Sequence, residues 1–270
     1  MTPSGTRLSP MRIAVVGGGV MGGTLVEAMA RAGHDDIVVI ERSPERRAEL
    51  EAQGRSTAAD IEAVAGAQVV LLVVKPQDVA AVLPALASDL DPDATVVSLA
   101  AGVRTATIED VLPDTVAVVR AMPNTPAVIG RGMFGVSPGN RVSSERLDTV
   151  VDLLGAGGEV VVVDESRQDA VTAVSGSGPA YVFYLAEQMI AAGIDAGLDP
   201  EAARTLTVQT LLGSAELLAG SDDQPAELRR RVTSPNGTTH AAITTFDDQG
   251  VGEGIRAGVR AAAARSAELG

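Results

Sequence analysis

The stretch "RIAVVGGGVMGGTLVEAMARAG", Arg12–Gly33, decides the fold class. It opens with a short run of apolar, mostly β-branched residues and continues into a segment whose apolar residues have helical spacing. Between the two lies "GGGVMG", Gly17–Gly22, which fits the pattern G-x-G-x-x-G. After a predicted strand and before a predicted helix, this pattern indicates a dinucleotide-binding loop.

Each glycine of the loop has its own physical task. Gly17 permits the tight turn, Gly19 lets the backbone approach a pyrophosphate, and Gly22 lets the helix pack close to the strand. The N–H groups at the helix start, at Val20 and Met21, carry a positive partial charge that attracts phosphate. A glycine turn without a ligand is the weaker alternative.

The pattern of strand and helix repeats through the first half of the chain. Apolar strands are predicted at residues 36–41, 67–76, 94–102, 116–124, 132–138 and 158–166, with helices at 43–54, 77–90 and 143–154. Such continuous apolar strands are typical of a sheet that is buried on both faces. Residues 11–164 are therefore expected to form a Rossmann-like α/β domain, with a mostly parallel sheet and helices on both faces.

The β-branched runs end near Glu165, and the rest of the chain is rich in alanine and helical in pattern. Residues 165–270 are expected to form an all-α domain for substrate binding and dimerisation. The segment 179–198 begins with Pro179 in its first turn and is apolar nearly all round. Such a helix must be buried, against another subunit or within its own domain.

Composition excludes several classes of protein. The net charge is −14, aromatic residues make up 2 %, there is no Cys and there are two His. Nucleic-acid partners, anionic membranes, disulfides, thiolate catalysis and a metal site are therefore not expected. No apolar run reaches the roughly 18 residues of a membrane span, and residues 1–10 are expected to be a flexible tail without an apolar leader region. A cytoplasmic protein is predicted.

The residues after the second strand bear on the choice of cofactor. Glu41 stands where an acidic residue usually binds the ribose hydroxyls of NAD. Arg42 and Ser43 follow at once, and arginine with a hydroxyl suits the 2′-phosphate of NADP. We expect NADPH, bound through Arg42 and Ser43, with NADH as the alternative. That Arg46 and Arg47 are merely solvated helix residues stays equally open.

Small or polar residues follow two further strands, where ligands of a doubly wound sheet bind. Lys75 is expected to face the crevice, although an ordinary loop lysine is the alternative, and small residues after the next strand leave room for a flat nicotinamide. The cofactor residues predicted at these two ends are Val74, Lys75, Pro76, Ala100, Ala101 and Gly102.

The stretch "VTSPNGTTHAAI", Val232–Ile243, places hydroxyl groups where a loop becomes a helix. Unpaired N–H groups and hydroxyls at such a helix start can bind an anion without Arg or Lys. We expect a small carboxylate to bind here, with a plain helix cap as the alternative. The residues predicted to contact it are Val232, Ser234, Asn236, Gly237, Thr238 and Thr239.

Four motifs in order, "VVKPQD", "VVRAMPNTPAVIGRG", "AVSGSGPAYVFYLAE" and "VTSPNGTT", resemble the pyrroline-5-carboxylate reductase family from Arg12 to about Leu269. The resemblance implies hydride transfer from NADPH or NADH to the C=N bond of 1-pyrroline-5-carboxylate, which gives L-proline in the last step of proline biosynthesis. It also implies a dimer with interleaved helical domains and larger rings, such as a decamer of dimers.

The resemblance also assigns residues. It places Met122, Pro123 and Asn124 beside the nicotinamide and gives Thr239 the catalytic role, which we interpret as a hydrogen bond to the ring nitrogen. Ser175 and Ser177 would form a second wall of the substrate pocket; an N-cap before Pro179 explains them equally well.

The chain also departs from the family pattern. Asn236 replaces the usual glycine, a change that the loop can tolerate because Asn adopts left-handed backbone conformations. Where many family members have His-Pro and Leu-Arg-Asp, this chain has Gln224-Pro225 and Leu228-Arg229-Arg230. The roles assigned to that His and Asp therefore cannot be carried over.

The sequence offers two alternatives to this function. A related imine reductase or a β-hydroxyacid-dehydrogenase-like NAD(P) oxidoreductase would carry a conspicuous Lys or Asp on the first long helix of the second domain, where this chain offers Glu187 and Gln188. A non-catalytic nucleotide sensor is disfavoured by the intact motifs around Ser175 and Thr239.

Overall fold

The computed structural model describes residues 11–269, so the expected tail of residues 1–10 lies outside the described residues. The chain forms two compact units: residues 11–177 together with 262–269, and residues 178–261. The two units are separated by the contacts that residues make within a single copy of the chain. The domain limit expected after residue 164, where the strands stop, stays a prediction.

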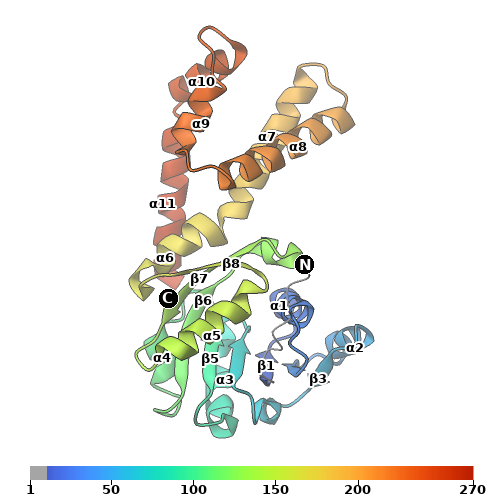
Figure 1. Cartoon of the computed structure of the whole chain (residues 1–270), viewed down its shortest axis with the longest axis vertical. Helices are drawn as coiled ribbons and strands as arrows, with labels where there is room; N and C mark the ends of the chain where they lie inside the picture. Colours follow the sequence, from blue (N-terminus) through green and yellow to red (C-terminus); the bar gives the residue numbers. More distant parts are fainter. Residues whose placement is uncertain (1–10, 270) are drawn as a thin grey trace, which may run out of the picture. The chain divides into compact units, whose positions relative to one another are not determined.

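The first unit contains one eight-stranded sheet (Figure 1), in the order β3-β2-β1-β4-β5-β6-β7-β8. Its strands are β1 (Ile13–Val16), β2 (Ile37–Ile40), β3 (Ser56–Ala58), β4 (Val69–Leu72), β5 (Thr95–Ser98), β6 (Ala117–Met122), β7 (Gly132–Pro138) and β8 (Gly158–Val162). Every neighbouring pair is parallel except β6 and β7. The expected mostly parallel sheet is confirmed.

Helices cover both faces of the sheet because both faces are apolar. The helices of this unit are α1 (Val20–Arg31), α2 (Pro44–Ala52), α3 (Pro76–Asp89), α4 (Thr105–Glu109), α5 (Ser144–Gly155) and α6 (Gln168–Val171). Alternate residues of β1 enter two cores: Ile13 and Val15 share one with α1 and α5, and Ala14 and Val16 share the other with α3 and α4. This alternation is the period of two expected for a strand.

Two details of the sheet were not predicted. Strand β3 lies at the edge and its residues Ser56, Thr57 and Ala58 form no apolar run, since none of them is fully buried. Strand β7 runs antiparallel to β6 because residues 123–131 form only a loop with the short 3₁₀ turn η2 (Thr125–Ile129). A parallel return needs a crossover of about a dozen residues or more.

Beyond β8 the chain passes through the turn η3 (Glu165–Arg167), α6 and a π-helical turn, η4 (Thr172–Gly176). The helices that follow are α7 (Gly178–Asp195), α8 (Pro200–Ala219), α9 (Pro225–Arg231), α10 (Thr238–Asp248) and α11 (Val251–Leu269), the last of which ends in the first unit. Helix α7 packs along α8 (Figure 1), with Gly193 against Ala203.

Helix α7 has no buried residue within the chain. Val182, Phe183 and Tyr184 are 50, 67 and 65 % exposed. The alternative of burial within its own domain is therefore wrong, because the second unit is too thin to enclose an apolar helix. The apolar surface of α7 is left for another subunit to cover.

Candidate functional site

The glycine loop has the geometry of a phosphate-binding turn. Gly17 has a φ of +109°, and a Cβ on it would collide with the carbonyl oxygen of Val73. A Cβ on Gly22 would collide with the carbonyl oxygen of Gly17, whereas a Cβ on Gly19 would meet no atom within 4 Å. No side chain caps α1, whose N-cap is Gly19. The first N–H groups of α1 are thus available to an anion at an open backbone.

Two side chains from the β2–α2 segment hold Gly18. The backbone N–H of Gly18 donates to Oε2 of Glu41 at 2.9 Å, and Nε of Arg46 donates to the carbonyl of Gly18 at 2.6 Å. The other oxygen of Glu41 accepts from the backbone N–H of Ser43 at 2.9 Å. These contacts connect the phosphate loop rigidly to the end of β2.

The side chains expected to bind the 2′-phosphate differ in how they are engaged. The hydroxyl of Ser43 caps α2 by accepting from the N–H of Arg46 at 3.2 Å and donates to Glu45 at 2.8 Å. The pKa of Glu45 is lowered, first by its own backbone N–H and then by this hydroxyl. Arg42 is exposed, and its guanidinium makes no hydrogen bond or ion pair to the described residues. It is the free cation at this place.

The predicted cofactor residues of the first unit follow the carboxyl ends of parallel strands. The glycine loop follows β1, Arg42 follows β2, and the remaining groups follow β4, β5 and β6, as Lys75, Gly102 and Asn124 show. Strands β2, β1, β4, β5 and β6 are neighbours in this order and all run parallel. Their carboxyl ends therefore meet at one edge of the sheet. The structure therefore brings these residues to a common edge.

A buried ion pair supports the loop after β5. Arg120 on β6, whose side chain is 7 % exposed, lies 3.5 Å from Glu165. The same carboxylate accepts from the backbone N–H and from the hydroxyl of Thr105, both at 2.7 Å. Thr105 begins α4 directly after the predicted loop around Gly102. Glu165 thus ties that loop to β6.

The π-helical turn lies against the end of β6. The side-chain amide of Asn124 donates to the carbonyl oxygen and to Oγ of Ser175, both at 3.3 Å. A Cβ on Gly176 would lie 2.6 Å from the methyl group of Met122. Two segments that were predicted separately, one beside the nicotinamide and one beside the substrate, therefore lie in contact. Sequence reasoning did not foresee this contact.

The predicted carboxylate site in the second unit is a turn followed by a helix start. Residues 234–237 form a four-residue turn, which is closed by a hydrogen bond from the N–H of Gly237 to the carbonyl of Ser234 at 3.0 Å. Pro235 is the second residue of this turn and Asn236 the third. Asn236 has a φ of 59°, the one positive value of a non-glycine residue in the described chain. The prediction that Asn supports the left-handed backbone here is confirmed.

Helix α10 begins without a side-chain cap, and its N-cap is Gly237. A Cβ on Gly237 would lie 2.5 Å from Oγ of Ser234, so a larger residue here would displace that hydroxyl. Neither Thr238 nor Thr239 caps the helix, and the choice between a carboxylate site and a plain helix cap stays a prediction. The N–H groups of the first turn are left to an outside partner.

Just before this turn, α9 carries an ion-pair cluster where the family pattern has other residues. Glu227 accepts from Arg230 at 2.6 and 2.8 Å, and Arg231 joins Glu227 and Asp223. The hydrogen bonds from Arg230 and then its charge lower the pKa of Glu227 to about 2. Arg230, which stands where the family pattern has Asp, is therefore engaged on the surface of α9.

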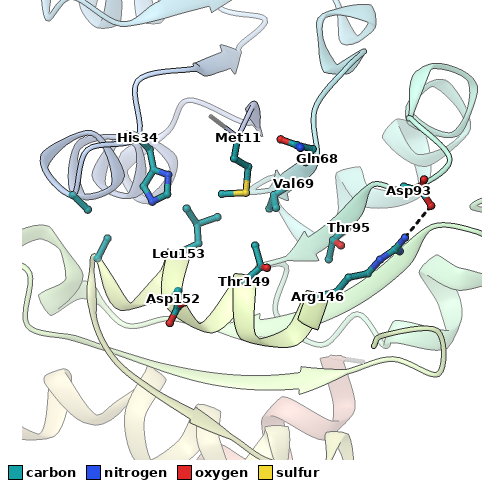
Figure 2. A pocket seen from close by; sticks show the side chains of 12 residues that line it. Met11, His34, Gln68, Val69, Asp93, Thr95, Arg146, Thr149, Asp152 and Leu153 are labelled. Atoms are coloured by element: carbon teal, nitrogen blue, oxygen red, sulfur yellow. Dashed lines mark hydrogen bonds and ion pairs between the residues drawn. The ribbon is translucent and has the colours of Figure 1, made fainter. Parts of the chain in front are cut away.

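A hollow of about 660 Å³ lies elsewhere in the first unit (Figure 2). It is lined by Val69 and Thr95, the first residues of β4 and β5, and therefore lies at the amino edge of the sheet, opposite the glycine loop. Figure 2 shows His34 and Met11 pointing into it, with the pair Arg146–Asp93, 3.3 Å apart, at its rim. Its volume alone would suggest a ligand site, but none of the predicted site residues lines it.

Among residues 11–269, no helix is long and apolar enough to cross a membrane, and no cluster of His, Cys, Asp and Glu could hold a metal ion. An open glycine loop at the carboxyl edge of a mostly parallel sheet, followed by a helical region, defines an NAD(P)-dependent oxidoreductase. Residues 12–102 accordingly match a family model described as NADP oxidoreductase coenzyme F420-dependent.

The comparisons identify the family. Residues 165–269 match the model for pyrroline-5-carboxylate reductase dimerisation. The chain is 43 % identical to the pyrroline-5-carboxylate reductase of Pseudomonas aeruginosa over 97 % of its own length and 98 % of the relative's. The structure of the Coxiella burnetii pyrroline-5-carboxylate reductase is 34 % identical, with a TM-score of 0.91 over 97 % of this chain and 99 % of that one.

The structure of the Plasmodium falciparum pyrroline carboxylate reductase, solved with NADP bound, is 26 % identical, with a TM-score of 0.86 over 96 % of this chain and 98 % of that chain. The chain belongs to the pyrroline-5-carboxylate reductase family, as its motifs predicted. It carries the family's dimerisation region, residues 165–269, and this region includes the uncovered helix α7.

Proposed function

We propose that this chain reduces the C=N bond of 1-pyrroline-5-carboxylate with NADPH and releases L-proline. Reduction adds a hydride to the carbon and a proton to the nitrogen of that bond. Bound NADPH would supply the hydride and solvent water the proton, while the protein supplies position and charge. Full-length similarity to curated reductases supports the reaction, and the geometry of residues 234–239 supports the way the substrate is held.

The first unit fits the cofactor. The open backbone at Gly19 and the uncapped start of α1 suit the pyrophosphate, and the exposed guanidinium of Arg42 suits a 2′-phosphate. The remaining cofactor residues are proposed to act as predicted from the sequence, except Asn124, whose amide is engaged by Met133 and Ser175. NADH stays the alternative cofactor, because Glu41 could also accept the ribose hydroxyls.

The second unit supplies an anion site without a cationic side chain. The uncapped N–H groups at the start of α10 and the hydroxyls of Ser234 and Thr238 bind the substrate carboxylate, while Val232 and Asn236 shape the turn. Hydrogen bonds to a charged group contribute roughly 1.5–3 kcal/mol each. Thr239 donates to the ring nitrogen and orients the C=N bond. The single observation that carries this assignment is that no side chain caps the N–H groups in the first turn of α10, which follows Gly237.

The assembly and location belong to the same proposal. Dimers would form through α7 and the other helices of the second unit and associate further into rings, such as the decamer of dimers expected from the family. A cytoplasmic location remains a prediction. Light scattering of the purified protein would measure the mass of the assembly.

The deciding experiment is a steady-state assay of NADPH and NADH oxidation with 1-pyrroline-5-carboxylate. We expect turnover that requires the imine, releases proline and is faster with NADPH at low cofactor concentration. 3-Hydroxyisobutyrate with NADP⁺ serves as the control for the dehydrogenase alternative. Turnover with the hydroxyacid and none with the imine would refute the proposal.

A further inference from the structure

The π-helical turn η4 has a cause in the sequence. Pro179 stands four residues after Ser175, and the proline ring clashes with the carbonyl four residues before it in an α-helix. The chain avoids this clash by widening the helix: the N–H of Ser177 donates to the carbonyl of Thr172 at 2.8 Å, five residues back. Such π-turns are often found at functional sites.

Pro179 also removes a hydrogen-bond donor. In a regular α-helix the carbonyl of Ser175 would accept from the N–H of residue 179, but proline has none. The side-chain amide of Asn124, from the end of β6, donates to this carbonyl instead at 3.3 Å. The half-buried carbonyl is thereby satisfied by a residue 51 positions away in the chain.

The orientation of the Asn124 amide follows from its other contact. Its Oδ1 accepts from the backbone N–H of Met133 on β7 at 2.8 Å, and a backbone N–H can only donate. The NH₂ group must therefore face Ser175, and its two hydrogens suffice for both the carbonyl and Oγ. The amide has no remaining donor for the nicotinamide, beside which the sequence motif placed it.

The contact with Oγ has a chemical consequence for Ser175. Because its Oγ accepts from Asn124, the hydroxyl hydrogen of Ser175 stays free, and this hydroxyl donates no hydrogen bond to the described residues. A hydroxyl held in this way is a donor. It suits the carboxylate of 1-pyrroline-5-carboxylate, an anion that otherwise meets a chain of net charge −14.

We propose that Asn124 is a positioning residue of the reductase: it closes the π-turn that Pro179 opens and presents the hydroxyl of Ser175 as a donor to the substrate carboxylate. This inference rests on the proposed function and on the substrate-binding role that the family resemblance gives Ser175. It predicts that Asn124 acts on the Michaelis constant for the imine through Ser175, while the affinity for NADPH is set elsewhere.

The test is a double-mutant cycle of Asn124→Ala and Ser175→Ala, with kcat/KM for 1-pyrroline-5-carboxylate and Kd for NADPH as readouts. We expect each single change to lower kcat/KM by about tenfold, the loss of a hydrogen bond to a charged group. In the Ser175→Ala background, Asn124→Ala should lower kcat/KM less than about twofold, since the hydroxyl that Asn124 positions is already absent. The Kd for NADPH should stay within about twofold throughout.

Asn124→Asp provides a second variant in case the alanine variant does not fold. Aspartate keeps an oxygen for the N–H of Met133 but has no donor, so the hydroxyl of Ser175 would turn toward the carboxylate and be lost to the substrate. We expect the KM for the imine to rise about tenfold or more. Asn140→Ala is the matched control, because that amide makes one contact, to Glu109 at 3.3 Å, and should leave kcat/KM unchanged.

The outcomes separate the two proposals. If Ser175→Ala lowers kcat/KM and Asn124→Ala does not, or if Asn124→Ala costs the same in both backgrounds, the inference about Asn124 fails alone. If Ser175→Ala has no effect, the substrate role of Ser175 fails, and the inference with it. A parallel loss of NADPH affinity would make Asn124 a cofactor contact, and failure of both Asn124 variants to fold would make its role structural; either result overturns the inference.

Discussion

Glu41 accepts a hydrogen bond from the backbone N–H of Gly18 at 2.9 Å, and the carbonyl of the same glycine accepts from Arg46 at 2.6 Å. Gly18, the second residue of the glycine loop, is thus held on both sides by the segment that we propose to choose between NADPH and NADH. Arg46 has a structural contact here, which leaves Arg42 as the exposed cation for a 2′-phosphate.

Arg42→Ala is therefore expected to raise the KM for NADPH by roughly tenfold or more, since one charge-assisted hydrogen bond of about 1.5–3 kcal/mol is lost. The KM for NADH should change little, because NADH has no 2′-phosphate. Arg31→Ala is the control, as Arg31 is exposed and pairs with Glu27 at 3.8 Å at the far end of α1. An equal effect of Arg42→Ala on both cofactors would contradict the phosphate assignment.

Gly19 and Gly22 should respond differently to alanine. Gly19→Ala meets no atom within 4 Å and Gly19 has a negative φ of −62°, so the fold should tolerate it. Its methyl group would occupy the approach of the pyrophosphate, and NADPH affinity should fall at least about tenfold. Gly22→Ala would collide with Gly17 and should destabilise the protein itself. Calorimetry with and without NADPH distinguishes the two, and Gly155→Ala, in open space, is the control.

Thr239→Ala is expected to lower kcat/KM for 1-pyrroline-5-carboxylate by up to about tenfold, the loss of one neutral hydrogen bond. The Kd for NADPH should not change, and Thr239→Ser should restore most of the rate because it restores the hydroxyl. Thr245 lies in the same helix with its hydroxyl bonded to the carbonyl of Ala241 at 3.0 Å. Thr245→Ala should be silent; equal rates for Thr239→Ala and wild type would remove Thr239 from the mechanism.

His34 is expected to make stability depend on pH. Burial at the hollow lowers its pKa below 6.5, against a smaller raising effect of Asp35, while Arg146 and Asp152 also line the hollow. As pH falls below 6.5, the unfolded chain binds a proton that the folded chain does not, so stability is lost. His34→Gln should remove this loss. Urea unfolding between about pH 5 and 8 measures it, and a constant difference between the two proteins would contradict it.

Pro179→Ala restores the backbone N–H that proline lacks and therefore tests whether the carbonyl of Ser175 depends on Asn124. By itself, Asn124→Ala should lower the free energy of unfolding by at least about 1 kcal/mol, because the carbonyl of Ser175 and the N–H of Met133 both lose their partner. With alanine at position 179, a backbone N–H is again available to that carbonyl, and the cost of Asn124→Ala should shrink. Additive effects of the two substitutions in thermal unfolding would show that the carbonyl does not depend on Asn124.

Local pattern predicted the elements that are long or strongly apolar. The strand and helix around Gly17–Gly22, the Ser43 cap of α2 and the helix that begins near Pro179 all lie where the sequence indicates them. Strand β3 was missed because an edge strand of three residues buries little and needs no apolar run. The direction of β7 was missed because it depends on the path of the chain between strands.

The sequence by itself determined the family, the phosphate loop and the turn at Asn236, because each depends on neighbouring residues: glycines that free the backbone, an Asn that accepts a positive φ, and apolar residues with a regular period. Only the tertiary structure decided how Glu41 and Arg46 hold Gly18 and how Asn124 meets Ser175. These pairs are 23, 28 and 51 residues apart, and a side chain reaches such a partner only after the sheet has ordered the strands that carry it.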